Sequence, residues 1–169
     1  MKSMEITQAI ELLSSFIGNP SKGLPEEIFL FISKITPLVN VDLLIKDEQN
    51  RTLLTWRDDG FASAGWHLPG GIIRYKETLA DRIKAVAKNE LRALVDYNPV
   101  PLATKECLIK DRQVRGHFIS FLYQCRLIDK LDESLKYNSE APHANQWLWH
   151  SNCPCNIISA HNEMYREFI

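Results

Sequence analysis

The sequence predicts an α/β fold: a single α-β-α sandwich with a mixed sheet, preceded by an extra N-terminal helix. Segments with apolar residues at helical spacing intermingle with segments in which apolar and polar residues alternate, and no segment repeats. The chain has 169 residues, of which 45% are hydrophobic and 24% charged, so it is long enough for one domain with a buried core.

The N-terminal segment 4–17 carries apolar residues at helical spacing, and the Gly and Pro residues that follow it end the helix. We therefore divide the chain into a helical extension, 1–22, and a main domain, 23–169. The main domain is expected to hold helices at 26–36, 78–95 and 157–169, and strands at 38–47, 51–57, 66–75, 102–111, 115–129 and 146–150.

Composition excludes several classes of partner. The net charge is -1 without a dense Lys/Arg block, so we expect neither nucleic acid nor an anionic membrane surface as a partner. No apolar run approaches the roughly 20 residues that span a bilayer. Glu5 and Glu11 interrupt the N-terminal apolar pattern, which argues against a signal peptide, and we expect a cytoplasmic protein. The four cysteines match no common zinc module and are interpreted as reduced thiols.

The predicted helix 78–95 places one carboxylate where apolar residues are expected. Leu79, Ile83, Val86 and Leu94 share a face, and Glu90 lies in the middle of it. Since a buried, uncompensated carboxylate is costly, Glu90 must find a partner. One hypothesis is a structural partner, either a core Arg or a backbone group.

The alternative is a divalent cation, for which Mg²⁺ is the natural candidate because it prefers oxygen ligands. The Pro-Gly-Gly turn at 69–71 favours this hypothesis, because two glycines let the backbone approach a ligand and turn carbonyl oxygens toward it.

Three residues of this region also match a known pattern. Gly71, Glu77 and Glu90 stand where the Nudix hydrolase signature has its first Gly, its first Glu and its last Glu. The positions that depart from the signature are Ala85, Val86, Asn89 and Arg92, so the Nudix box is degenerate.

The chain is most similar to the GDP-mannose mannosyl hydrolase branch of that superfamily, from about residue 24 to residue 91. The segments "TPLVNVDLLI", "LLTWR" and "GWHLPGG" carry the likeness. The resemblance implies Mg²⁺, with Mn²⁺ as a substitute, held by Glu90, by the Gly70 carbonyl and by a loop side chain, for which Asn145 or Gln146 is the candidate. It also implies a nucleotide sugar as the small-molecule substrate. Water attacks the sugar C1, and nucleoside diphosphate and free sugar leave.

The same resemblance implies roles for further residues and a homodimer. His143, in the loop before the last strand, is the candidate general base, since His suits neutral pH. Arg57 would contact the diphosphate and Asp42 would accept hydrogen bonds from the sugar. The family's Arg after the Gly-Gly pair is Ile72 here, so Arg74 is the substitute that we expect to reach the diphosphate. Glu77 is expected to be structural, because Ala85 replaces the Arg that normally pairs with it.

Two alternatives to this glycosyl hydrolase remain open. One is a Nudix diphosphatase in which water attacks phosphorus. The other is a Nudix-fold domain that binds a nucleotide without turning it over, an interpretation that the losses at Ile72, Ala85 and Arg92 keep open.

Overall fold

The computed structural model describes the backbone of residues 2–61, 63–138 and 140–169, and their side chains from Glu5 onward. Its α-helices are α1 (Lys2–Ser15), α2 (Glu26–Ile32), α3 (Leu79–Val86) and α4 (Ser159–Tyr165). Its strands are β1 (Leu38–Ile45), β2 (Thr52–Arg57), β3 (Gly65–His67), β4 (Gly70–Ile72), β5 (Val95–Tyr97), β6 (Ala103–Leu108), β7 (His117–Leu127) and β8 (Trp147–His150).

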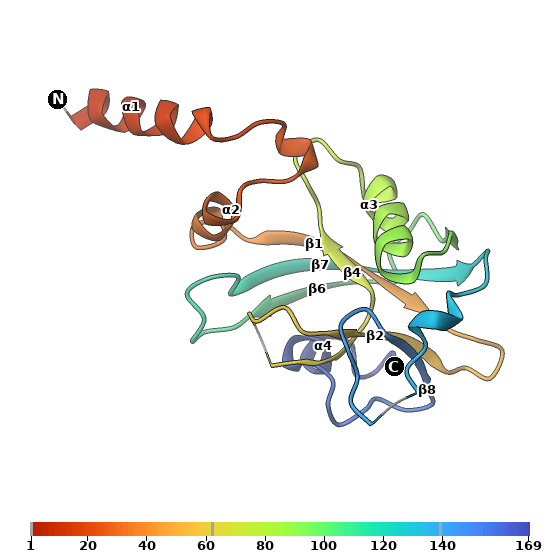
Figure 1. Cartoon of the computed structure of the whole chain (residues 1–169). Coiled ribbons are helices and arrows are strands. Elements are labelled where there is room, and N and C mark those ends of the chain that lie inside the picture. Colours follow the sequence, from red (N-terminus) through yellow and green to blue (C-terminus); the bar gives the residue numbers. More distant parts are fainter. Residues whose placement is uncertain (1, 62, 139) are drawn as a thin grey trace.

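The described strands form a mixed sheet and a smaller antiparallel one. In the mixed sheet β4, β1 and β7 are neighbours, and both β5 and β6 pair with the other edge of β7. The β1–β7 pair is parallel, and the remaining pairs of this sheet are antiparallel. The smaller sheet has the order β3-β2-β8. Figure 1 shows α3 over one face of the mixed sheet and α4 on the opposite side, which confirms the predicted α/β sandwich.

Strand β1 separates two layers of the core, because its side chains alternate between the two faces. Val41, Leu43 and Ile45 belong to the cluster that contains Ile83 of α3. Leu44 belongs to the cluster on the α4 side. Each buried aliphatic side chain contributes roughly 1.5–3 kcal/mol relative to an exposed one. The alternation puts the intervening Asp42 on the α4 side of the sheet.

The helix predicted at 78–95 ends earlier than expected. Helix α3 stops at Val86, one π-helical turn covers Ala87–Leu91, and Arg92 adopts a left-handed conformation with φ 51°. This conformation breaks the helical repeat. Leu94, expected on the buried face, is 55% exposed. Strand β5, which pairs with the end of β7, was not predicted.

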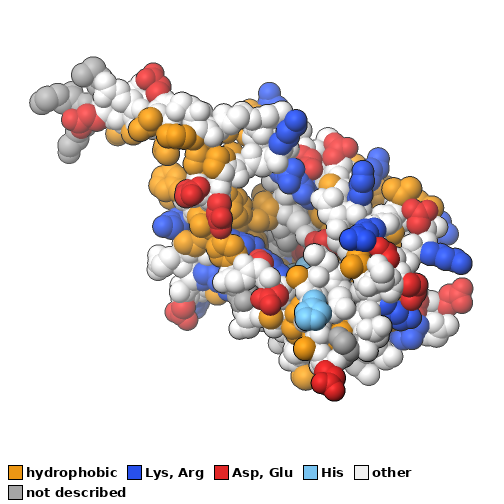
Figure 2. Space-filling view, viewed as in Figure 1, with side chains coloured by type: hydrophobic (Ala, Val, Ile, Leu, Met, Phe, Trp, Pro, Cys, Tyr) orange, Lys and Arg blue, Asp and Glu red, His pale blue; other side chains and the backbone are white. Residues whose placement is uncertain are grey.

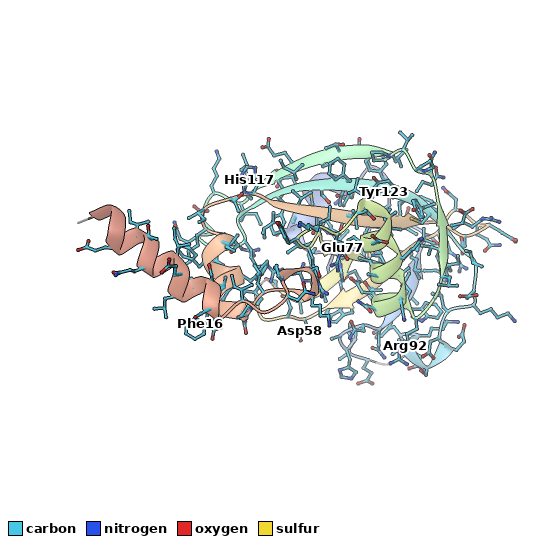
Figure 3. The ribbon with its side chains drawn as sticks, turned by 90° about the horizontal axis from the view of Figure 1, so that it is seen from above. Phe16, Asp58, Glu77, Arg92, His117 and Tyr123 are labelled. Atoms are coloured by element: carbon cyan, nitrogen blue, oxygen red, sulfur yellow. The ribbon has the colours of Figure 1, made fainter. Side chains whose placement is uncertain are left out.

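Helix α1 projects from the body of the molecule, as the red ribbon in Figure 1 shows. Residues 5–16 are all exposed, and Figure 3 shows Phe16 beside the body rather than within it. Hydrophobic side chains line the underside of α1 and continue onto the adjoining surface in Figure 2. Among the described residues, no helix combines the length and the apolar character that crossing a membrane requires.

Candidate active site

A cavity of about 380 Å³ lies where β1, β2, β4 and the loop before β8 meet. Its polar lining combines four carboxylates, two imidazoles, two guanidinium groups and two side-chain amides. These residues are Asp42, Asp58, Asp59, Glu90, His67, His161, Arg57, Arg115, Asn40 and Asn145. The cavity therefore brings together residues that were predicted from the sequence, such as Glu90, and residues that were not, such as His161.

Glu90 reaches this cavity from the π-helical turn after α3. Its Oε1 accepts a hydrogen bond from the Gly70 backbone N–H at 3.2 Å. Its Oε2 accepts one from the Thr55 hydroxyl at 3.0 Å. Burial raises the pKa of Glu90 to about 7, while these two hydrogen bonds oppose the shift. The carboxylate thus has a backbone partner, as one of the structural hypotheses required, but among the described residues it forms no ion pair with Arg or Lys.

The register of β4 on β1 orients both backbone polar groups of Gly70. Leu43 N donates to Pro69 O and Ile73 N donates to Val39 O. Since hydrogen-bonded and non-hydrogen-bonded pairs alternate in an antiparallel ladder, the Asp42–Gly70 pair is a non-hydrogen-bonded one. The N–H and C=O of Gly70 therefore both point away from β1, toward the side on which Glu90 lies.

The buried Arg of this region pairs with Glu77, not with Glu90. The Arg82 guanidinium donates to Glu77 Oε2 at 2.6 and 2.8 Å, and both side chains are largely buried. Glu77 was expected to be structural because Ala85 replaces the signature Arg, and an Arg from another position, Arg82, pairs with it instead. Arg82 lies nearly one helical turn before Ala85, so a search of the signature position alone misses it.

Asp42 lies on the floor of the cavity and is almost fully buried. Its Oδ2 accepts hydrogen bonds from Tyr165 at 2.7 Å and from Ser120, and Asn40 donates to Oδ1 at 3.3 Å. Burial raises the pKa of Asp42 to about 6, although these donors lower it. Asp42 lines the cavity, and much of its accepting capacity is used by neighbouring side chains.

Two histidines that the sequence analysis did not select complete the floor. The Leu68 N–H donates to His161 Nδ1 at 3.0 Å, so the proton of the neutral ring is on Nε2, 3.8 Å from Asp42 Oδ1. His67 Nε2 lies 3.1 Å from the Thr55 hydroxyl and 3.7 Å from Glu90 Oε2. Burial lowers the pKa of both imidazoles, that of His161 to about 3, so both are neutral at pH 7.

A signal for His67 was present in "GWHLPGG", since pairing of 51–57 with 66–75 puts His67 beside Thr55. His161 has no comparable local signal, because it reaches the cavity from α4.

Two Arg and two Asp side chains meet at the mouth of the cavity. Arg57 donates from Nε to Asp59 Oδ2 at 2.9 Å, and Arg115 Nη1 lies 3.4 Å from the same oxygen. Arg57 was predicted here. Arg115 was not, because it comes from the turn between β6 and β7, for which no role was expected.

Two predicted residues lie elsewhere. The imidazole of His143 is exposed and is not part of the lining, although the next two residues, Ala144 and Asn145, are. Arg74 lines a second, mostly apolar cavity beside Gly23. Of the two candidates for a third metal ligand, Asn145 lines the site, whereas the Gln146 side chain accepts a hydrogen bond from the His143 N–H.

The oxygen atoms around Glu90 fit a divalent ion that has few protein ligands. Mg²⁺ is commonly held by one or two carboxylates, with waters and substrate phosphates filling its octahedron. Glu90 and the Gly70 carbonyl would supply two oxygens on one side of the cavity. Among the described residues, no group of three or more His, Cys, Asp and Glu is arranged to hold a metal by itself. Waters and a substrate would supply the other ligands.

We compared the sequence and the structure with those of known proteins. No family model matches the chain. The low-salt glycan biosynthesis protein Agl8 of Haloferax volcanii is 32% identical over 114 residues, which cover 65% of this chain and 72% of that protein. The MutT protein of Methanosarcina mazei Go1 superposes with a TM-score of 0.60 at 14% identity, over 79% of this chain and 94% of that chain. A NUDIX hydrolase of Nitrosomonas europaea superposes with a TM-score of 0.55 at 14% identity, over 69% and 73% of the two chains.

Proposed function

We propose that this chain, which shares the fold of the Nudix hydrolases and is similar to Agl8, is an Mg²⁺-dependent Nudix hydrolase of a nucleotide sugar. We further propose that it follows the GDP-mannose mannosyl hydrolase pattern, in which the sugar C1 is attacked. The observation that carries this proposal is the Glu90 carboxylate, held in a polar cavity on the side to which the Gly70 carbonyl points.

The reaction requires a limited contribution from this chain. An oxygen of water bonds to the sugar C1 as the bond from C1 to the diphosphate oxygen breaks, and the diphosphate keeps the electron pair. The chemistry supplied by a bound divalent cation is Lewis-acid stabilisation of the charge that develops on the leaving group. Such a cation would be held by Glu90 and the Gly70 carbonyl, with Asn145 as the lining residue able to add a third oxygen. One carboxylate suffices for this task, because no hydroxide has to be generated for attack on phosphorus.

We assign substrate binding and proton transfer to the remaining candidate residues. Arg57 at the mouth would bind the diphosphate with its planar fork. Asp42 on the floor would orient the sugar through the hydroxyl-rich network around it. His143 is our proposed general base, and its loop must turn the exposed imidazole inward to take a proton from the attacking water. Arg74 would take part only if the ligand extended toward the second cavity.

The proposed substrate class rests on the similarity to Agl8 and on the residues that line the cavity. Agl8 is named for glycan biosynthesis, and an enzyme of nucleotide sugars is consistent with such a role. The two guanidinium groups at the mouth suit a diphosphate, and the polar floor suits a sugar.

The test is incubation of the protein with a panel of nucleotide sugars and Mg²⁺ in ¹⁸O-labelled water. Attack at C1 predicts that nucleoside diphosphate and free sugar form together and that the label enters the sugar. Sugar 1-phosphate plus labelled nucleoside monophosphate would instead establish diphosphatase chemistry. Binding of a nucleotide sugar without any Mg²⁺-dependent product would support the non-catalytic alternative.

We also propose a cytoplasmic homodimer. The apolar stripe of α1, formed by Ile6, Ile10, Leu13 and Phe16, is exposed in the single chain, and a second copy is the occupant that we expect for it.

A further inference from the structure

Arg115 is a charged residue at the cavity that the proposed mechanism does not use. It lies in the turn between β6 and β7, with φ 55°, and its side chain is 12% exposed. Its backbone N–H donates to the Ser33 hydroxyl at 3.2 Å, which ties the turn to the end of α2. The backbone of Arg115 is therefore held in place by the contact with the end of α2.

The Arg115 guanidinium also stacks on an aromatic ring. Its central carbon lies 4.6 Å from the ring centroid of Phe61 and 6.0 Å from that of Phe29. Both rings lie within reach of a cation–π contact, which leaves the N–H groups of the guanidinium free to donate hydrogen bonds. The edge atom Nε is buried and has no hydrogen-bond partner among the described residues. A buried donor without a partner costs free energy, so a ligand that accepts from it gains that amount.

Arg115 and Arg57 converge on a single carboxylate. Asp59 Oδ2 accepts from Arg57 and lies 3.4 Å from Arg115 Nη1. Burial and the neighbouring Arg57 charge both lower the pKa of Arg115, as expected for two cations held close together. Asp59 accepts from both guanidinium groups and Asp58 also lines the mouth, so two acidic side chains balance the two positive charges. An anion that binds here would compete with Asp59 as the acceptor for the two guanidinium groups.

We propose that Arg115 binds the diphosphate of the nucleotide ligand together with Arg57, supplying the charge that Ile72 cannot. This inference rests on the proposed function for the choice of ligand. Ile72 lines the same cavity, and its side chain offers the leaving group neither charge nor a hydrogen bond. The guanidinium of Arg115 therefore reaches the diphosphate from the β6–β7 turn rather than from β4.

The test measures binding alone, so it stays informative if turnover is never found. Affinity for inorganic pyrophosphate and for GDP is measured by calorimetry on the full chain without divalent metal. The variants are Arg115→Ala, Arg115→Lys and the matched control Arg126→Ala, which removes an equal charge from a side chain that is 79% exposed on β7. Thermal melts of all variants check that they fold.

Arg115→Ala is expected to weaken pyrophosphate binding at least tenfold and Arg126→Ala by less than twofold. Arg115→Lys keeps the charge but loses the fork, and a fivefold or greater loss is expected. This variant decides the question if Arg115→Ala does not fold. Unchanged affinity in the Arg115 variants, or no binding of either ligand to the wild type at millimolar concentration, would overturn the inference. Turnover failure with Arg115-dependent binding would overturn only the proposed hydrolase.

Discussion

Arg82 donates two hydrogen bonds to the same Glu77 oxygen, at 2.6 and 2.8 Å, across the start of α3. Glu77 also accepts the backbone N–H of Arg74 at 2.9 Å. The pair therefore joins the segment after β4 to the helix that leads to Glu90. Figure 3 shows Glu77 beside α3. Neither Arg82 nor Glu77 lines the cavity, so the ion pair stabilises the elements around the site and does not contact a ligand there.

Replacing Arg82 with Ala is expected to destabilise the fold by roughly 3 kcal/mol, because it leaves the buried Glu77 carboxylate without its counter-ion. Urea unfolding of Arg82→Ala, Glu77→Gln and the double variant measures this coupling. The double variant should be less destabilised than the sum of the two single variants. Strict additivity would mean that the pair is not coupled in solution.

Gly70 is expected to tolerate no side chain. A Cβ at this position would lie 2.0 Å from Asp42 Oδ1 and 3.0 Å from the Val41 carbonyl oxygen. Gly70→Ala should therefore destabilise the protein by roughly 1–3 kcal/mol and lower turnover, since both β4 and the Asp42 carboxylate must shift. Gly18→Ala is the control, because no described atom lies within 4 Å of its added Cβ. Equal unfolding midpoints for the two variants would show that β4 is not packed this closely.

Asp42 should give the stability a distinct dependence on pH. Burial raises its pKa from an ordinary value of 3.8 to about 6, so in that interval the folded protein keeps a proton that the unfolded chain loses. Stability associated with this proton is present below the unfolded pKa and is lost as the pH rises through the folded one. The loss amounts to roughly 3 kcal/mol.

Asp42→Asn removes this titration. The free energy of unfolding of the variant, minus that of the wild type, should therefore rise between pH 4 and about pH 7. Denaturant unfolding at several pH values measures the difference. The control Asp111→Asn replaces an exposed carboxylate. A constant difference for Asp42→Asn would show that the buried carboxyl does not titrate in this interval.

The N-terminal extension is expected to be separable from the main domain. Residues 5–16 of α1 are exposed in the single chain, so deletion of residues 1–18 should leave the thermal midpoint of the domain within a few degrees. Light scattering on both forms measures the oligomer. If α1 joins two copies, the deletion should convert a dimer into a monomer. A large loss of thermal stability in an already monomeric protein would contradict this assignment.

The sequence allowed the fold and part of the site to be predicted because both depend on local patterns. Alternation along 38–47 identified β1, and the Pro-Gly-Gly turn before a helix with a carboxylate on its apolar face identified Glu90. The end of α3 was misplaced, because the residue type of Arg92 does not indicate the left-handed conformation that follows the helix. Similarly, Val95 was placed in a helix, and its pairing with Leu127 lies outside any local pattern.

The residues that the analysis missed reach the cavity from distant segments. His161 arrives on α4, and Arg115 arrives from the turn before β7. Neither lies near a motif. The Arg partner of Glu77 was missed for a different reason: Arg82 pairs with Glu77 but does not stand at the signature position. In such cases only the packing of elements shows which side chains meet.

Binding of a divalent ion at Glu90 is the most direct test of the account. Mn²⁺ titrations followed by electron paramagnetic resonance, with GDP present, compare the wild type with Glu90→Gln and with the control Glu106→Gln, whose side chain is 62% exposed. We expect one bound Mn²⁺ that Mg²⁺ displaces, at least tenfold weaker affinity in Glu90→Gln, and no change in Glu106→Gln. Equal affinity in the wild type and Glu90→Gln, or no bound ion in the wild type, would contradict the proposed metal site.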